Sequence, residues 1–195
     1  MSAEHKTKAV LLTGAAGFIG FHVAEALLAR GISVVGVDNL NAYYAPSLKR
    51  ARLARLEPRQ GFVFHAADIA DHEGLRRIPG VDDVDVVVHL AAQAGVRHSL
   101  DHPFDYASSN LVGHLSVLEL VRHARKRPRL VYASSSSVYG VNAKTPFAET
   151  DPVESPVSLY AATKRAGEVM SESYARLYDI EQIGLRFFTV YGPWG

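Results

Sequence analysis

Two side chains that could move a proton stand four residues apart in the segment 158–164. A helix over this segment would place the Tyr160 phenol and the Lys164 ammonium on one face. Four serines, at 134–137, precede the tyrosine and follow an apolar run. A hydroxyl, a phenol and an ammonium brought together would form a proton-transfer site. The Tyr-x-x-x-Lys pattern is weak by itself, since nine tyrosines and six lysines produce it by chance roughly 0.3 times in a chain of this length.

These groups need a strand and a helix to position them, and the whole chain alternates the two. Short apolar runs predict six strands, at 9–13, 32–37, 61–66, 84–90, 130–134 and 180–188. Helical patterns predict helices at 18–30, 47–56, 71–78, 104–126 and 159–177. Buried strands that alternate with helices indicate an α/β fold, a Rossmann-like doubly wound parallel sheet of about six strands with helices on both faces.

The composition is that of an ordinary globular protein and excludes several classes. A length of 195 residues, with 48% hydrophobic and 21% charged side chains, suits one domain over residues 1–195. The net charge is +1, so we expect neither a nucleic acid nor an anionic membrane as partner. The absence of cysteine excludes disulfides, thiolate metal sites and a cysteine nucleophile. No apolar run approaches the ~18 residues of a membrane span and no signal peptide is apparent, so we expect a cytoplasmic protein.

A glycine-rich turn lies between the first predicted strand and the first predicted helix. Gly14, Gly17 and Gly20 would permit a tight turn and the close approach of a pyrophosphate, which the positive end of the helix would bind. The G-x-x-G-x-x-G spacing departs from the G-x-G-x-x-G pattern, and a plain strand-to-helix turn would also explain it. Asp38 follows the second strand, 18 residues after Gly20, where a carboxylate can bind both ribose hydroxyls. Because this carboxylate would repel a 2′-phosphate, we expect NAD rather than NADP.

Together these motifs resemble those of the extended short-chain dehydrogenase/reductases, and most closely the nucleotide-sugar epimerases of the UDP-glucuronate 4-epimerase kind. The resemblance rests on segments in the order of that family, at 13–20, 38–39, 68–69, 89–97, 132–140, 158–164 and 184–194. It covers nearly the whole chain. It implies NAD as cofactor and C4 epimerisation of UDP-glucuronate or UDP-galacturonate through a transient 4-keto intermediate.

The resemblance also implies roles for particular residues. Tyr160 would be the catalytic base, Lys164 its partner, and Ser135 the hydroxyl that binds the reacting sugar oxygen. The cofactor would contact Gly14, Gly17, Phe18, Ile19, Gly20, Asp38, Asn39, Asp68, Ile69, Leu90, Ala91, Ala92, Gln93, Tyr160, Lys164 and Phe187. The substrate would contact Arg97, Ser135, Ser136, Ser137 and Thr189. The ammonium of Lys164 and a positive nicotinamide ring would both lower the pKa of the Tyr160 phenol toward neutrality.

The serine cluster favours epimerisation over elimination of water. Related sugar dehydratases carry an acidic residue just after the catalytic Ser or Thr, whereas Ser136 and Ser137 follow Ser135 here. The resemblance also implies a C-terminal substrate domain, which we expect these 195 residues not to include. A catalytically silent NAD-binding module and a reductase that consumes free NADH therefore stay open as alternatives. Relatives often dimerise through the two long helices, so a homodimer through 104–126 and 159–177 is possible.

Two other groups of residues could bind ligands. His98 and His102 have the spacing of metal ligands on a helix, but no third ligand is apparent, so we expect no metal site. The helix at 47–56 is expected to present a solvated basic face, formed by Lys49, Arg50, Arg52 and Arg55.

Overall fold

The centre of the protein is a six-stranded parallel sheet, in a computed structural model that describes residues 9–141 and 144–195. The strand order is β3-β2-β1-β4-β5-β6, so the order reverses between β1 and β4. The strands are β1 (Ala9–Thr13), β2 (Ser33–Asp38), β3 (Phe62–Ala66), β4 (Val86–His89), β5 (Arg129–Ser135) and β6 (Gln182–Phe187). The predicted doubly wound sheet is confirmed.

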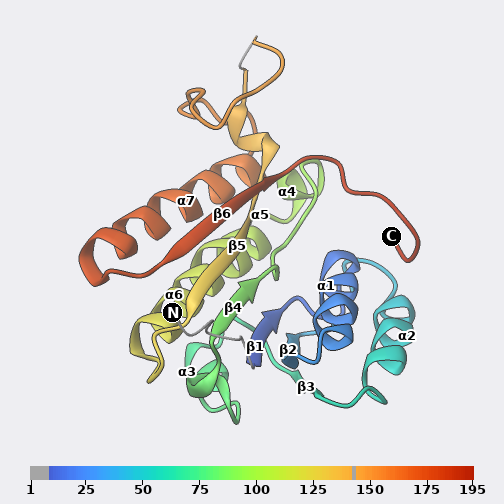
Figure 1. Ribbon diagram of the computed structural model, residues 1–195. Helices are drawn as coiled ribbons and strands as arrows, with labels where there is room; N and C mark the ends of the chain where they lie inside the picture. Colours follow the sequence, from blue (N-terminus) through green and yellow to red (C-terminus); the bar gives the residue numbers. More distant parts are fainter. Residues whose placement is uncertain (1–8, 142–143) are drawn as a thin grey trace.

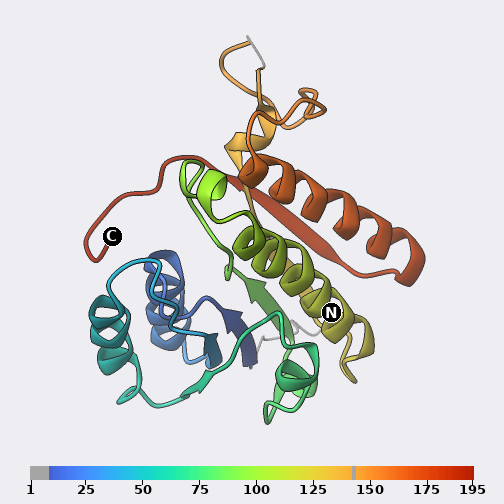
Figure 2. The same ribbon diagram turned by 180° about the vertical axis from the view of Figure 1, so that it is seen from behind.

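Helices cover the sheet from both sides (Figures 1 and 2). The α-helices are α1 (Phe18–Ala29), α2 (Pro46–Leu56), α3 (His72–Arg76), α4 (His98–Asp101), α5 (Pro103–Tyr106), α6 (Gly113–His123) and α7 (Leu159–Tyr178). Shorter turns are η1 (Val81–Asp83), the π-helical η2 (Ala107–Val112) and η3 (Ser136–Tyr139). α1 and α2 lie on one face of the sheet, and α3, α6 and α7 lie on the other.

The core consists of two apolar layers that share β1. Successive side chains of a strand point to opposite faces, so Leu11 and Leu12 enter different layers. Leu11 packs in the layer that contains Val117 of α6, and Leu12 packs in the layer that contains Phe21 of α1. Both leucines are fully buried. These two layers fix the positions of α1 and α6 on opposite faces of the sheet.

The predicted helix at 104–126 is wrong in detail, because the structure breaks it into three parts. α5 ends at Tyr106, the π-helical turn η2 follows, and α6 begins at Gly113. A π turn inserts a residue into the helix and so rotates the side chains that follow. This turn carries Asn110, whose side chain is buried. At Gly113 a Cβ atom would lie 2.6 Å from Cδ1 of Ile69, so the start of α6 packs closely on the segment after β3.

The expectation of a solvated basic face on α2 is wrong for two of its four residues. Lys49 is 5% exposed and Arg52 is 1% exposed, whereas Arg50 and Arg55 are exposed. Buried charges need partners, and these two side chains have partners outside the helix, which a helical pattern alone does not show.

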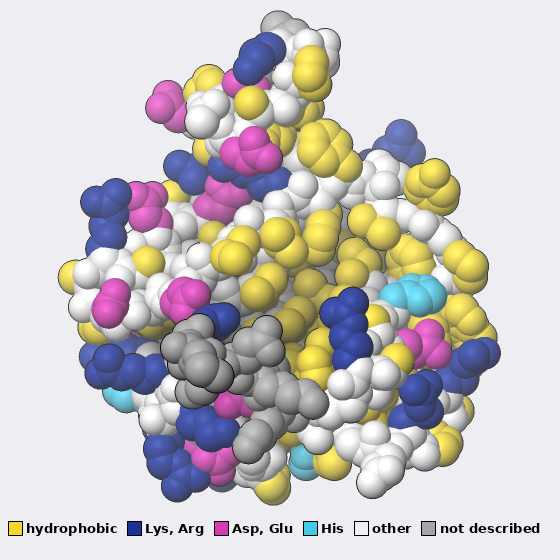
Figure 3. All heavy atoms as spheres, in the orientation of Figure 1, with side chains coloured by type: hydrophobic (Ala, Val, Ile, Leu, Met, Phe, Trp, Pro, Cys, Tyr) yellow, Lys and Arg dark blue, Asp and Glu magenta, His cyan; other side chains and the backbone are white. Residues whose placement is uncertain are grey.

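The other half of the sheet has an open apolar face. Ile183 and Leu185 of β6 are 60% and 38% exposed, and Phe188 beyond the strand is 60% exposed. Among the described residues no helix lies in front of β5 and β6 in Figure 1, and Figure 3 shows hydrophobic side chains gathered over this region.

Candidate active site

A pocket of about 600 Å³ opens at the carboxyl ends of β1, β4 and β5, beside the N-terminus of α1. Doubly wound sheets bind ligands at this edge, where the strand order reverses. The lining includes these predicted cofactor contacts: Gly14, Gly17, Phe18, Ile19, Gly20, Asp38, Asn39, Ile69, Leu90, Ala91, Ala92, Gln93, Tyr160, Lys164 and Phe187. Ser135 lines the same pocket. The fold therefore gathers both predicted halves of the site around one cavity.

The glycine-rich turn has no room for side chains at two positions. Gly14 has φ +73°, and a Cβ atom there would lie 2.8 Å from the backbone nitrogen of Ala91. A Cβ atom at Gly20 would lie 2.0 Å from the carbonyl oxygen of Gly14. The helix cap Gly17 has no side chain to bind the first N–H groups of α1, so these donors face the pocket. The turn has the properties of an anion-binding helix start.

Asp38 is buried at the end of β2 with its carboxylate held from three sides. One carboxylate oxygen accepts from the backbone N–H of Leu40 at 2.8 Å and from the Lys49 ammonium at 3.2 Å. The other accepts from the backbone N–H of Ala16 in the glycine-rich turn, at 3.3 Å. Lys49 also donates to the side-chain oxygen of Asn41 at 3.0 Å. The carboxylate therefore faces the pocket in a fixed orientation and with a positive partner.

Asp68 supports the pocket from outside its lining. Asn39 lines the pocket, and its amide donates to the Asp68 carboxylate at 3.0 Å. Asp68 also accepts from the backbone N–H of Ala70 at 2.8 Å. The neighbouring Ile69 is buried and does line the pocket. The structure thus places Asp68 where it orients Asn39, instead of among the lining residues.

Ser135, Tyr160 and Lys164 come together from the end of β5 and the start of α7. Ser135 is the last residue of β5, and its hydroxyl accepts from the backbone N–H of Ser137 at 3.2 Å. α7 begins directly after Ser158, whose hydroxyl caps the helix by accepting from the Ala161 N–H at 3.0 Å. One helical turn then carries Tyr160 and Lys164 into the pocket lining. The three groups can bind a hydroxyl-bearing substrate and exchange its proton.

Burial is the main influence of the protein on the pKa of Tyr160. Burial raises the pKa of the phenol above its ordinary value, and a hydrogen bond with Ser135 acts in the lowering direction without cancelling this effect. The Lys164 ammonium donates to the Ala133 carbonyl at 3.0 Å, and burial lowers the pKa of Lys164 to about 8. Because burial raises the pKa of Tyr160, the resting phenol is protonated at neutral pH.

The other serines of the cluster have different surroundings. Ser134 is buried and donates to the Glu168 carboxylate at 2.6 Å. Ser136 and Ser137 begin η3, and the hydroxyl of Ser137 accepts from that of Ser135 at 3.1 Å. Neither Ser136 nor Ser137 lines the described pocket. Ser137 is placed to orient the Ser135 hydroxyl.

Asn110 connects three parts of the site and was missed by the sequence reasoning. Its amide nitrogen donates to the Gln93 carbonyl and to the Thr163 hydroxyl, each at 3.0 Å, and its oxygen accepts from the Gln93 N–H at 2.8 Å. It thereby ties the loop after β4 to α7. The sequence does contain a signal for this role, because Asn110 is a polar amide inside a long apolar helical pattern. A buried amide needs hydrogen-bond partners, so its position indicates contacts with other segments.

A pair of buried histidines lies behind Lys164. His89 of β4 lies 2.7 Å from the Thr13 hydroxyl, and His114 of α6 lies 2.8 Å from the Ser171 hydroxyl. Their ring centroids are 5.2 Å apart. Burial, and then the charge of Lys164, lowers the pKa of His114 to about 4, and burial also holds the pKa of His89 well below its usual range. Both rings are neutral at pH 7, so Lys164 carries the positive charge of this cluster.

Two further predicted substrate contacts, besides Ser136 and Ser137, lie outside the pocket lining. Arg97 and Thr189 are both exposed, and the lining contains neither. The expectation that His98 and His102 lack a third potential metal ligand is wrong, because Asp105 lies beside them. The ligand atoms of the three side chains lie within 4.8 Å of one another, and the two imidazole rings stack with centroids 4.1 Å apart.

The fold and the pocket define a dinucleotide-binding α/β protein with a Ser, Tyr and Lys site of the short-chain dehydrogenase/reductase kind. Over residues 10–195 the chain matches the family described as the NAD dependent epimerase/dehydratase family, and it belongs to that family. NAD is the cofactor of this family. The chain's residues fit it, because the glycine-rich turn, the first residues of α1 and the Asp38 carboxylate line one pocket.

Two curated relatives are identical to this chain at about half of the aligned positions. UDP-glucuronate 4-epimerase 4 of Arabidopsis thaliana is 53% identical over 186 residues, which cover 95% of this chain and 42% of that protein. UDP-glucuronate 4-epimerase 3 of the same plant is 52% identical over 197 residues, which cover all of this chain and 46% of the relative. The chain thus spans about half the length of these relatives.

Solved structures show the same arrangement. UDP-glucuronic acid 4-epimerase from Bacillus cereus, in complex with UDP-glucuronic acid and NAD, matches with a TM-score of 0.84 and 37% identity over 95% of this chain and 58% of that one. A UDP-glucose 4-epimerase from Thermotoga maritima matches with a TM-score of 0.83 and 34% identity, over 95% and 57% of the two chains. Among the described residues, no helix is long and apolar enough to cross a membrane.

Proposed function

We propose that the protein acts as an NAD-dependent nucleotide-sugar epimerase that inverts C4 of UDP-glucuronate or UDP-galacturonate. The observation that carries the proposal is the convergence of Ser135, Tyr160 and Lys164 on a pocket that the glycine-rich turn also lines. The relatives named UDP-glucuronate 4-epimerases support the choice of sugar. Residues 1–195 would form the NAD-binding domain with the catalytic groups.

In this proposal Tyr160 moves the proton and its neighbours position the substrate. NAD, when bound, supplies the acceptance and the return of the C4 hydride. Ser135 would donate a hydrogen bond to the C4 oxygen, and Tyr160 in its phenolate form would remove the hydroxyl proton as the sugar becomes a 4-keto sugar. The same phenol would give the proton back once the ketone has turned over. Lys164, held by the Ala133 carbonyl, would supply the positive charge that favours phenolate during transfer.

The serines distinguish inversion from elimination. Elimination would need a base to remove a further proton from the sugar, and the positions after Ser135 carry Ser136 and Ser137. The nearby carboxylate of Glu168 is engaged by Ser134, Arg165 and Arg186 at 2.6–3.0 Å, so it supports the strand end instead of facing the sugar. These contacts favour return of the hydride over loss of water.

The test is conversion of UDP-glucuronate by the purified chain, followed by separation of the two epimers. We expect product with the original chain, and a loss of at least about a hundredfold with Tyr160→Phe, as for removal of an acid–base group. Tyr178→Phe is the matched control, because Tyr178 lies on the same helix far from the pocket lining. Bound NAD without product would favour a catalytically silent NAD-binding module, and steady consumption of NADH would favour a reductase.

A further inference from the structure

Arg52 of α2 binds three different segments although it is almost completely buried. Its guanidinium donates to the Ala16 carbonyl at 2.9 Å and to the Tyr44 hydroxyl at 3.0 Å. It also donates to the Trp194 carbonyl, from Nε at 3.2 Å and from Nη2. No carboxylate pairs with it among the described residues. Burial of a guanidinium among neutral acceptors costs free energy, because no opposite charge compensates for the water that it loses. Arg52 is therefore a candidate for a functional role.

The segment 188–195, here called the strap, is the distant partner of Arg52. It leaves the end of β6, arches over the carboxyl edge of the sheet and reaches α1 and α2 (Figures 1 and 2). Phe188, Val190 and Gly195 line the pocket together with Asp38 and the glycine-rich turn. The strap therefore runs along the opening of the cofactor pocket.

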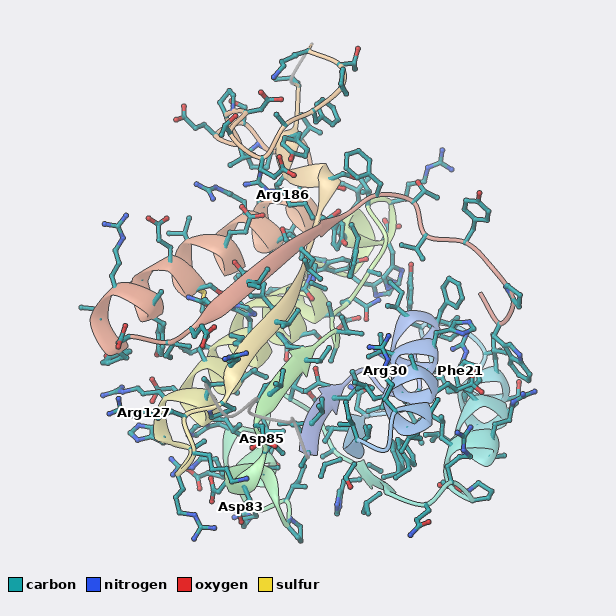
Figure 4. The ribbon with its side chains drawn as sticks, viewed as in Figure 1. Phe21, Arg30, Asp83, Asp85, Arg127 and Arg186 are labelled. Atoms are coloured by element: carbon teal, nitrogen blue, oxygen red, sulfur yellow. The ribbon has the colours of Figure 1, made fainter. Side chains whose placement is uncertain are left out.

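The far end of the strap is fastened by further contacts with α1 and α2. The Pro193 carbonyl lies 2.9 Å from Nε2 of His22. The ring centroids of Trp194 and Phe21, which Figure 4 labels on α1, lie 5.7 Å apart, and the Arg55 guanidinium lies 5.2 Å from the centroid of the Trp194 ring. A cation over an indole ring and an aromatic pair each stabilise such a contact modestly.

Between its two ends the strap has little support. Tyr191 is 90% exposed and Val190 is 46% exposed, so solvent covers the outer side of the strap. Segments with few buried contacts open locally at low free-energy cost. The contacts at Pro193 and Trp194 thus decide whether the strap lies across the pocket, and Arg52 makes the most deeply buried of them.

We infer that Arg52 is a positioning residue that fastens the strap across the dinucleotide pocket and so slows the escape of the cofactor. The inference rests on the proposed use of NAD. An epimerase must return the hydride that it removes, so the reduced cofactor has to stay bound until the ketone has turned over. Arg52 also binds the Ala16 carbonyl, so the same guanidinium connects the strap to the turn that would hold the pyrophosphate.

The test is the dissociation rate of NADH from the purified 195-residue chain, measured by the loss of NADH fluorescence after mixing with excess NAD. We expect dissociation about tenfold faster in Arg52→Met and in Trp194→Ala than in the original chain, because each variant loosens the strap. Arg50→Met is the matched control, since Arg50 is exposed on the same helix, and it should keep the original rate. Epimerase turnover is not the readout, so absence of product would bear on the proposed function alone.

A double variant separates fastening from general destabilisation. If Arg52 and Trp194 act on one strap, the double variant should release NADH no faster than about twofold beyond the faster single variant, because the two effects are coupled. The inference would be overturned if the double variant accelerated NADH dissociation by the product of the two single effects. It would also be overturned if Arg52→Met left the dissociation rate unchanged. If Arg52→Met does not fold, Trp194→Ala with His22→Ala decides the matter, and an unchanged rate in both overturns it.

Discussion

The ammonium nitrogen of Lys49 lies 3.2 Å from a carboxylate oxygen of Asp38, and both side chains are at most 7% exposed. The preference for NAD over NADP was predicted from the negative charge of Asp38 alone. In the structure the Lys49 ammonium accompanies it, so the charge of the carboxylate is balanced within the pair. Discrimination against a 2′-phosphate then depends on the ion pair as a unit.

Removal of the Asp38 charge should change the cofactor preference. In Asp38→Asn the Lys49 ammonium stays in place without its partner and can bind a 2′-phosphate. We expect the ratio of the NADP and NAD dissociation constants to fall by about tenfold or more, as for a lost charge contact of ~1.4 kcal/mol. Fluorescence titration with both cofactors measures the ratio. Asp82→Asn, on the distant turn η1, is the control, and an unchanged ratio in Asp38→Asn would contradict the role of the pair.

Lys164 should make stability rise with pH on the alkaline side. Its pKa is about 8 in the folded protein and about 10.4 in an unfolded chain, so between these values the unfolded state binds more protons. The free energy of unfolding therefore increases as pH rises from about 8 to about 10. Urea unfolding of the original chain and of Lys164→Met across this range measures the effect. As pH rises, the free energy of unfolding of the original chain should increase relative to that of Lys164→Met. Parallel curves for the two proteins would show that Lys164 is not desolvated.

The buried histidine pair should make the protein sensitive to mild acid. His114 has a pKa of about 4 in the fold, against about 6.5 when unfolded, so protonation favours the unfolded state. Stability should be complete above pH 6.5 and fall as pH drops toward 4. His114→Gln keeps a polar group near the Ser171 hydroxyl and should flatten this slope in urea unfolding. His72→Gln, at an exposed histidine, should leave it unchanged, and equal slopes in all three proteins would contradict the assignment.

The Glu168 carboxylate should contribute strongly to stability. Burial acts to raise its pKa, but hydrogen bonds from Arg186, Ser134 and Arg165 hold it below the usual value. Arg186, labelled in Figure 4 on β6, also donates to the Glu149 carbonyl at 3.1 Å, so the pair fastens the loop after η3. Glu168→Gln leaves this arginine without a charged partner and should cost about 3 kcal/mol in urea unfolding.

An exposed pair on the same helix provides the control for this measurement. Glu172 pairs with Arg176 at side-chain exposures of 58% and 77%. Exposed pairs contribute roughly 0–1 kcal/mol, so Glu172→Gln should change the free energy of unfolding far less than Glu168→Gln. Equal losses in the two variants would show that the buried network is not special.

Several features followed from the sequence because their causes are local. Apolar runs predicted the six strands, because strands that are buried on both faces of a parallel sheet consist mainly of apolar residues. The glycines of the turn were predicted because backbone conformation and close approach at Gly14 and Gly20 exclude side chains. The spacing of Tyr160 and Lys164 placed them on one helical face, and the order of motifs identified the family.

Only the tertiary structure decided which partners the charged side chains have and where the predicted helix at 104–126 is interrupted. Both depend on contacts between separate segments of the chain. Lys49 and Arg52 belong to a basic helical pattern, yet their partners are Asp38 and a carbonyl at Trp194, 142 positions further along. The π turn carries Asn110, whose side chain donates hydrogen bonds to Gln93 and to Thr163 of α7. The raised pKa of Tyr160 is a consequence of burial, which no spacing of residues reveals. Local rules fix the backbone of the site, and packing between distant segments fixes its charge.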